Sequence, residues 1–223
     1  MYLPSNRNSW AIHVRYGSYV ARRLRTAQLN ELIDPVKAAT LKVQEMGRVW
    51  EDTDFTVQEV MADRDAADQV LDEQVREVRR KLIARSNNAE KEAPYTLIIP
   101  DGLRWYTSAP VDEELPRYKQ LRDRLTSYLP ETDELRVDLV PRLSSALDSY
   151  AQTEQQLEDT RNAEVRSRDT LEQSLNEWRS LMERTYGALI SLYGRSEADR
   201  FFPARSHSSA SQSNSSSQTS ANP

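Results

Sequence analysis

Two long stretches of the sequence carry apolar residues at alternating steps of four and three, and this pattern restricts the fold more than any other feature. The stripes run through residues 46–82 and 143–192. Such steps average to the 3.5-residue repeat of helices that pair lengthwise with another helix. Between residues 36 and 85 there is no proline, and Gly47 is the single glycine. We therefore expect two long helices, at about 36–86 and 134–193.

Two shorter helices and a hairpin complete the expected secondary structure. Apolar residues at helical spacing predict helices over about 10–33 and 112–129. The first of these should stop at Asp34-Pro35, because a residue before proline disfavours the helical conformation. Pro100-Asp101-Gly102 is turn chemistry between two β-prone runs. It predicts a small β-hairpin over about 95–107.

A long helix cannot bury its apolar stripe alone, so we expect the two long helices to pack antiparallel within one molecule. The predicted fold is all-α: an elongated antiparallel bundle of about four helices, two of them long and coiled-coil-like, with the hairpin at one end. Residues 10–203 would form a single domain after a flexible N-terminus, residues 1–9. Residues 204–223 are rich in Ser and nearly free of charge, which predicts a disordered tail.

Composition supports helices that each bury a narrow stripe. The chain of 223 residues is 38% hydrophobic and 29% charged, which is low in apolar and high in charged residues for a compact globule. Its 5 glycines argue against Rossmann folds and β-barrels, and the absence of cysteine excludes disulfides and thiolate metal sites. The net charge of -5 disfavours binding of nucleic acid by the body of the protein.

The aromatic residues of the expected hairpin form the first candidate interaction surface. Tyr95, Trp105 and Tyr106 flank the predicted turn, and large aromatic side chains of this kind anchor protein interfaces. The alternative is that they cap the open end of the bundle core. The two interpretations are compatible.

A charged layer interrupts the apolar stripes near their midpoint. If Pro35 lies beside Tyr193, Arg64 faces the neighbourhood of Glu164, with Arg161 and Arg168 on the same seam. A charged layer in such a seam costs stability and can fix the register of the helices. The simpler interpretation is that these long side chains reach into water where the bundle is thin.

A basic segment near the N-terminus is the second candidate surface. Met1–Asn30 carries five arginines and no acidic residue, and Arg22, Arg23 and Arg25 lie beside several aromatic residues. Arginine and aromatic side chains together can contact nucleic acid or an anionic membrane surface. The alternative is that this segment docks on the acidic faces of the protein's own long helices.

No residue pattern indicates a catalytic or metal site. The two histidines, His13 and His207, have no glutamate at helical metal-binding spacing, so a ferritin-like carboxylate site is excluded. There is no glycine-rich phosphate loop and no nucleophile elbow. The acidic run of Asp63, Asp65, Asp68 and Asp72 is interpreted as a solvated helix face. We expect no cofactor and no small-molecule substrate.

The sequence therefore favours a non-enzymatic interaction or structural protein that self-associates or scaffolds protein partners through long helix faces. One alternative is a regulatory module that binds an anionic partner, nucleic acid or a membrane surface, through the basic segment. Another is an enzyme with an unfamiliar site. No apolar run is long enough to span a membrane and no signal peptide is recognisable, so we expect a cytoplasmic protein.

Overall fold

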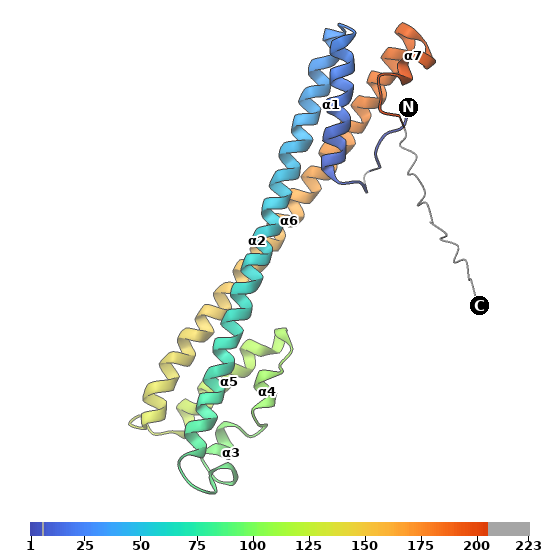
Figure 1. The fold of residues 1–223 in the computed structure, drawn as a ribbon. Coiled ribbons are helices and arrows are strands. Elements are labelled where there is room, and N and C mark those ends of the chain that lie inside the picture. The colour runs from blue at the N-terminus through green and yellow to red at the C-terminus, as the bar shows by residue number, and fades with distance from the viewer. Residues whose placement is uncertain (6, 205–223) are drawn as a thin grey trace, which may run out of the picture. The chain divides into compact units, whose positions relative to one another are not determined.

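Helices form every regular element in the part of the chain that the computed structural model describes, residues 1–5 and 7–204 (Figure 1). The elements in order are α1 (Trp10–Thr26), α2 (Asn30–Ile83), the 3-10 turn η1 (Ala89–Lys91), α3 (Tyr95–Ile98), α4 (Arg104–Thr107), α5 (Val111–Tyr128), α6 (Glu134–Tyr193) and α7 (Arg195–Asp199). The all-α class is thus confirmed. The Ser-rich segment expected to be a disordered tail lies, from residue 205 on, outside the described residues. None of the described helices is both long and apolar enough to cross a lipid bilayer.

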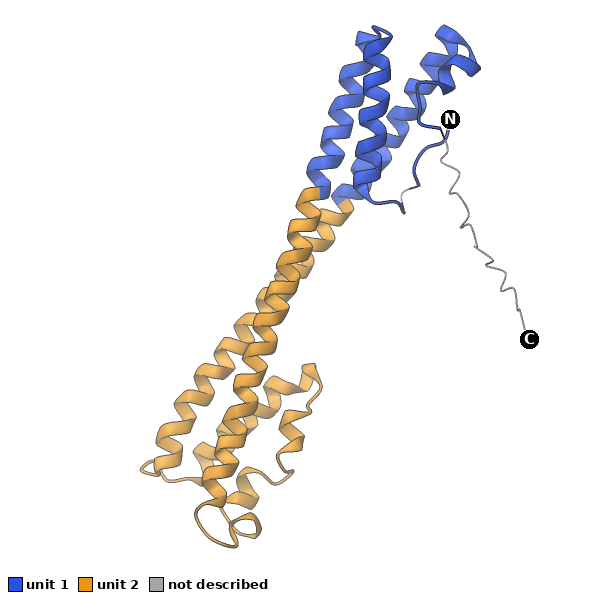
Figure 2. Ribbon diagram, in the orientation of Figure 1, with its two compact units in different colours: residues 1–47, 170–223 blue, residues 48–169 orange. Residues whose placement is uncertain are grey.

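The described chain divides into two compact units, where the sequence predicted one domain over 10–203 (Figure 2). Unit 1 contains residues 1–47 and those from 170 on, and unit 2 contains residues 48–169. The long helices α2 and α6 contribute residues to both units.

Unit 1 is built around Trp178 of α6, which is fully buried. The rings of His13 and Tyr16 from α1 meet the indole edge to face, and the indole Nε1 donates a hydrogen bond to Thr40 Oγ1 of α2 at 3.2 Å. The residues before α1 also lie on this unit, because Arg179 donates to the Pro4 carbonyl and Tyr16 to that of Tyr2.

Close contact between helices in unit 1 depends on two glycines. A Cβ on Gly47 would overlap the Trp10 ring, and one on Gly17 would overlap the Thr40 hydroxyl. Gly187, also helical, has open space around it. Glycine is therefore needed for close helix contact at positions 17 and 47 but not at position 187, although all three lie inside helices.

Alanine at Gly47 is expected to lower the free energy of unfolding by up to about 2 kcal/mol. Overpacking against the Trp10 ring costs about 1–3 kcal/mol, and the higher helix propensity of alanine offsets ~1 kcal/mol of this cost. Gly187→Ala, the matched control, should raise stability by about 0.5–1 kcal/mol. Urea unfolding of the three proteins measures both shifts. Stabilisation by Gly47→Ala would refute the close approach of Trp10.

The predicted first helix, 10–33, was wrong at its C-terminal end. α1 stops at Thr26 and α2 begins at Asn30, so Pro35 lies inside α2 and not at a break. Gln28 adopts a positive φ of 58°. The Leu29 N–H then bonds the Leu24 carbonyl at 3.1 Å, and Gln28 N–H bonds that of Arg25. This Schellman ending satisfies the helix carbonyls with glutamine at the position where glycine is usual, so no glycine marks the end of α1 in the sequence.

Unit 2 encloses an extended apolar core. α5 packs against α2 and α6, and η1, α3 and α4 cover the same end. The core side chains come from five helices and from two residues that directly follow α3 and α5: Leu71, Val75, Val78, Leu82, Ile98, Ile99, Tyr106, Tyr118, Leu121, Leu125, Leu129, Leu135, Leu139, Leu143, Ala146, Leu147 and Tyr150.

The β-hairpin predicted over 95–107 is wrong, because this segment contains the short helices α3 and α4 and no strand. Its turn does form: Gly102 has a positive φ of 76°, and its N–H bonds the Ile99 carbonyl. Ile98 and Ile99 are both buried on one core. Successive residues of a strand point to opposite faces, so a hairpin covering that core could bury only one of them. A helical turn lets both point inward.

One part of unit 2 consists of two helices only. We call residues 48–66 of α2 and 151–169 of α6 the two-helix stretch. Its apolar cluster contains just Val57, Val60 and Leu157, with Met61 packed against them. Polar pairs flank this cluster: Trp50 Nε1 donates to Glu164 at 2.7 Å, and the hydroxyls of Thr53 and Ser167 are 2.7 Å apart. The helices run antiparallel here, as expected.

Candidate functional site

The aromatic residues of the predicted hairpin lie in or against the unit 2 core. Tyr106 is buried, and its hydroxyl donates to the Ile98 carbonyl at 3.3 Å. Trp105 is half-buried under the Arg117 guanidinium, which stands 4.5 Å from the ring centroid. Tyr95 is also half-buried against the core. This geometry matches the capping interpretation of these residues better than an exposed interface.

The structure does not place Arg64 beside Glu164, as the predicted charged layer requires. Arg64 lies 3.6 Å from Glu154, not beside Glu164, and also pairs with Asp65 at 2.7 Å. Glu164 accepts the Trp50 indole N–H. Arg161 and Arg168 are exposed. The register of α2 against α6 thus differs by ten residues from the one assumed when Pro35 was placed beside Tyr193.

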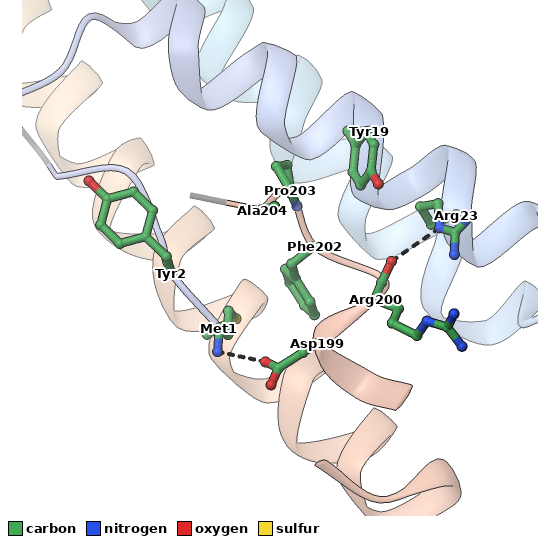
Figure 3. A pocket seen from close by; sticks show the side chains of 9 residues that line it. All are labelled: Met1, Tyr2, Tyr19, Arg23, Asp199, Arg200, Phe202, Pro203 and Ala204. Carbon is green, nitrogen blue, oxygen red and sulfur yellow. Dashed lines mark hydrogen bonds and ion pairs between the residues drawn. The ribbon is translucent and has the colours of Figure 1, made fainter. Parts of the chain in front are cut away.

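The predicted basic surface is exposed in unit 1. Arg22, Arg23 and Arg25 lie at the C-terminal end of α1, where positive charge favours the helix dipole. Arg23 Nε donates to the Arg200 carbonyl at 3.2 Å. It lines an open cavity of about 780 Å³ together with Met1, Tyr2, Tyr19, Asp199, Arg200, Phe202, Pro203 and Ala204 (Figure 3).

A further cluster, which the sequence did not predict, joins three helices of unit 2. We call Asp68, Asp72, Glu114, Tyr118 and Tyr150 the acid–tyrosine cluster. Tyr150 Oη of α6 donates to Glu114 Oε2 of α5 at 2.8 Å. Tyr118 Oη of α5 donates to Asp72 Oδ1 of α2 at 2.6 Å. The cluster therefore ties the first turns of α5 to both long helices.

Glu114 is the most unusual member of the cluster, because only 7% of the residue is exposed. Burial, and after it the adjoining Asp68 side chain, raises the pKa of Glu114 to about 7. The Tyr150 hydroxyl opposes this shift by donating to the carboxylate. Burial and the adjoining carboxylates raise the pKa values of Tyr118 and Tyr150 as well, so both phenols remain protonated donors.

The Glu114 Oε1 atom is buried and meets no N–H or hydroxyl donor. The Asp68 carboxyl of α2 adjoins Glu114. Burial without a second donor, next to another carboxyl group, favours the protonated form of Glu114.

The cluster can hold and release a proton, and it ties three helices together. Among the described residues, no three His, Cys, Asp or Glu side chains converge as metal ligands would. From sequence, Asp63–Asp72 was interpreted as a solvated face. Tyr118 and Tyr150 lie on the apolar stripes of their helices, and a buried phenol needs a hydrogen-bond partner. Asp68 and Asp72, one turn apart on α2, were the sequence signal for such partners.

Comparisons with known proteins find nothing similar: no family model, no curated protein and no solved structure matches this chain.

Proposed function

We propose that this chain is a non-enzymatic interaction protein that binds a basic helix of another protein along the two-helix stretch of unit 2. The observation that carries the proposal is the apolar cluster of Val57, Val60 and Leu157, which two helices share without a third. In the neighbouring part of unit 2, α5 supplies that third helix. A partner helix that continues the position of α5 along the two-helix stretch would cover this apolar cluster.

The face of α2 that binds α5 continues into the two-helix stretch. Asp72 and Asp68 contact α5, and Asp65 and Met61 precede them at steps of three and four on the same side of the helix. α5 starts at Val111, one turn before Glu114 meets Asp68. Within unit 2, α5 lies beside the part of α2 that follows the two-helix stretch (Figure 1). We therefore expect the third-helix position beside Met61 and Asp65 to be open.

One side of α6 carries a groove of about 470 Å³ within the two-helix stretch. The groove is lined by Ala151, Glu154, Gln155, Leu157, Glu158, Arg161 and Asn162. Val165 continues that side and is 53% exposed. Apolar atoms flanked by charged ones are what an amphipathic helix requires of a groove.

Charge indicates the kind of partner. Residues 48–66 contain six acidic residues and two arginines, and residues 151–169 contain five acidic residues and three arginines, so their net charges are -4 and -2. Like charge disfavours pairing of this stretch with its own copy, and opposite charge favours a Lys- or Arg-rich helix. Of the two interaction modes expected from sequence, self-association and scaffolding of partners, the charge favours a partner, and specifically a basic helix.

The test uses two synthetic helical peptides of about three heptads, with leucine at the a and d positions. One has lysine at the flanking positions and its twin has glutamate. Fluorescence anisotropy with the full chain should show micromolar binding of the lysine peptide, weakened by salt, and none of the glutamate twin. Equal binding of both peptides, or of neither, would contradict the proposal.

A matched pair of variants locates the binding. Glu158→Lys places a positive charge in the groove and should weaken binding of the lysine peptide by roughly tenfold. Asp159→Lys makes the same charge change one residue on, which is about 100° around the helix and away from the groove. It should have a much smaller effect. Equal effects of the two variants would indicate non-specific attraction to an acidic protein.

A second candidate function rests on the cavity of unit 1. There the exposed Arg23 stands with Tyr19 and Phe202, a combination that can stack on and pair with a polyanion such as single-stranded nucleic acid. Binding of an oligothymidylate should then fall steeply with salt and be lost in an Arg22→Gln, Arg23→Gln, Arg25→Gln variant. Unchanged binding by that variant would exclude the basic segment as the site.

A further inference from the structure

The first turns of α5 are held to α2 and α6 by acidic and phenolic groups. Glu114 accepts from Tyr150 of α6 and meets Asp68 of α2. One turn later, Tyr118 donates to Asp72 of α2. These contacts fix α5 only while the acidic groups can stay close together.

Few positive charges are placed to stabilise an ionised Glu114. Asp68 and Asp72 face it from α2, and Glu154 lies nearby on α6. Arg64 is the cation of this region, but its guanidinium pairs with Asp65 and Glu154, and its attraction is the weakest of the effects on Glu114. An ionised Glu114 would therefore stand buried beside another carboxylate.

We propose that a proton held by the buried Glu114 carboxyl latches the first turns of α5 to the long helices, and that loss of this proton loosens them. The latch is a property of unit 2 itself and requires no partner. It makes opening of this part of α5 dependent on pH near neutrality.

The sign follows from the pKa of Glu114, which rises from 4.5 to about 7 on folding. Below 4.5 the carboxyl is protonated whether α5 is docked or open, so pH has no effect through this group. Between 4.5 and about 7 the docked state keeps a proton that the open state loses, and opening becomes easier as pH rises. Above 7 both states lose the proton and the effect levels off.

Other carboxyls of unit 2 act in a different pH range. Arg and Lys partners lower the pKa values of Glu77 and Asp138, and the hydrogen bond from Arg85 contributes to the lowered pKa of Asp133. Their stabilising effect is lost only when the pH falls below the ordinary carboxyl range. The latch therefore acts at higher pH than these ion-paired carboxyls do.

Amide hydrogen exchange of the full chain, followed residue by residue by NMR, tests the latch. The reporters are Leu115, Arg117 and Tyr118, whose N–H groups bond carbonyls of the first turn of α5; Pro116 has none. After correction for intrinsic rates, opening should increase by roughly tenfold to a hundredfold from pH 5 to pH 8. A flat profile would overturn the proposal.

Two variants separate the latch from a general effect of pH. Glu114→Gln keeps an acceptor for Tyr150 and supplies an N–H for Asp68, so opening should be independent of pH and lower than in the parent at pH 8. Asp112→Asn changes an exposed acid of the same turn and should retain the parent profile. A pH profile that persists in Glu114→Gln, or disappears in Asp112→Asn, would contradict the latch.

The titration of Glu114 itself provides a readout that needs no variant. The side-chain carboxyl carbon, followed by NMR in the unaltered chain, should shift with a midpoint near pH 7. A midpoint near 4.5 would show that Glu114 ionises as it does in water, and the proton latch would be refuted.

Discussion

Replacing Trp178 with alanine is expected to lower the free energy of unfolding of unit 1 by about 3–5 kcal/mol. The indole is fully buried and joins three helices, since His13 and Tyr16 of α1 pack on it and Thr40 of α2 accepts its N–H. Alanine would leave a cavity beside Gly17. Gly17 already lies close to Thr40 of α2, so the helices have little room to close the cavity. Amide exchange of unit 1 residues, compared with the parent chain, measures the loss.

Leu192→Ala is the matched control on the same helix. Leu192 is 61% exposed, so its truncation should change the free energy of unfolding by less than about 0.5 kcal/mol. If Trp178→Ala costs less than about 1 kcal/mol, the indole does not occupy the centre of unit 1 and the described core is wrong.

Tyr150→Phe is expected to cost about 2–3 kcal/mol at pH 8, and less at pH 5. The Tyr150 hydroxyl donates to Glu114 Oε2, and a hydrogen bond to a charged group contributes more than one to a neutral group. At pH 8 the carboxylate that loses this donor is ionised and buried. At pH 5 it is protonated in the docked state, so less is lost.

Urea unfolding at the two pH values measures both costs. Tyr128→Phe serves as the control because Tyr128 is 47% exposed, and it should be nearly neutral at both pH values. Combining Tyr150→Phe with Glu114→Gln should cost less at pH 8 than Tyr150→Phe alone, since no charge is then stranded. Strict additivity of the two substitutions would show that the groups do not interact.

The helix pattern was accessible from sequence because it repeats over many turns. The heptad stripes predict helices over about 36–86 and 134–193, and the structure has α2 at Asn30–Ile83 and α6 at Glu134–Tyr193. Burial follows the stripes at Val57, Val60 and Leu157. Periodicity of this length reports which side of a helix is buried, whatever covers it.

Register was not accessible, because a heptad pattern repeats and permits several alignments. Pairing Pro35 with Tyr193 assumed that both helix ends coincide, whereas Pro35 lies inside α2. In unit 2 the alignment of α2 with α6 agrees with ion pairs near the C-terminal end of α2 and the N-terminal end of α6, such as Arg85 with Asp133 at 2.5 Å. No pattern within either helix identifies those partners.

The acid–tyrosine cluster escaped prediction for a related reason. Asp68 and Glu114 are far apart in the sequence, and each by itself looks like an exposed acid on a helix face or in a first helical turn. Their unusual chemistry arises only when α5 packs beside α2. Burial of Glu114 depends on this tertiary contact, and local sequence does not report it.

The chain contains no cysteine, so introduced cysteines can test directly whether α2 and α6 pair within one molecule in the two-helix stretch. The Thr53 and Ser167 hydroxyl oxygens are 2.7 Å apart, which suits a disulfide. The Thr53→Cys, Ser167→Cys protein should oxidise completely to a disulfide-bonded monomer. Thr53→Cys with Thr160→Cys, displaced by about 10 Å along α6, should not. Disulfide-linked dimers, or equal oxidation of both pairs, would contradict the intramolecular pairing on which the proposed binding surface depends.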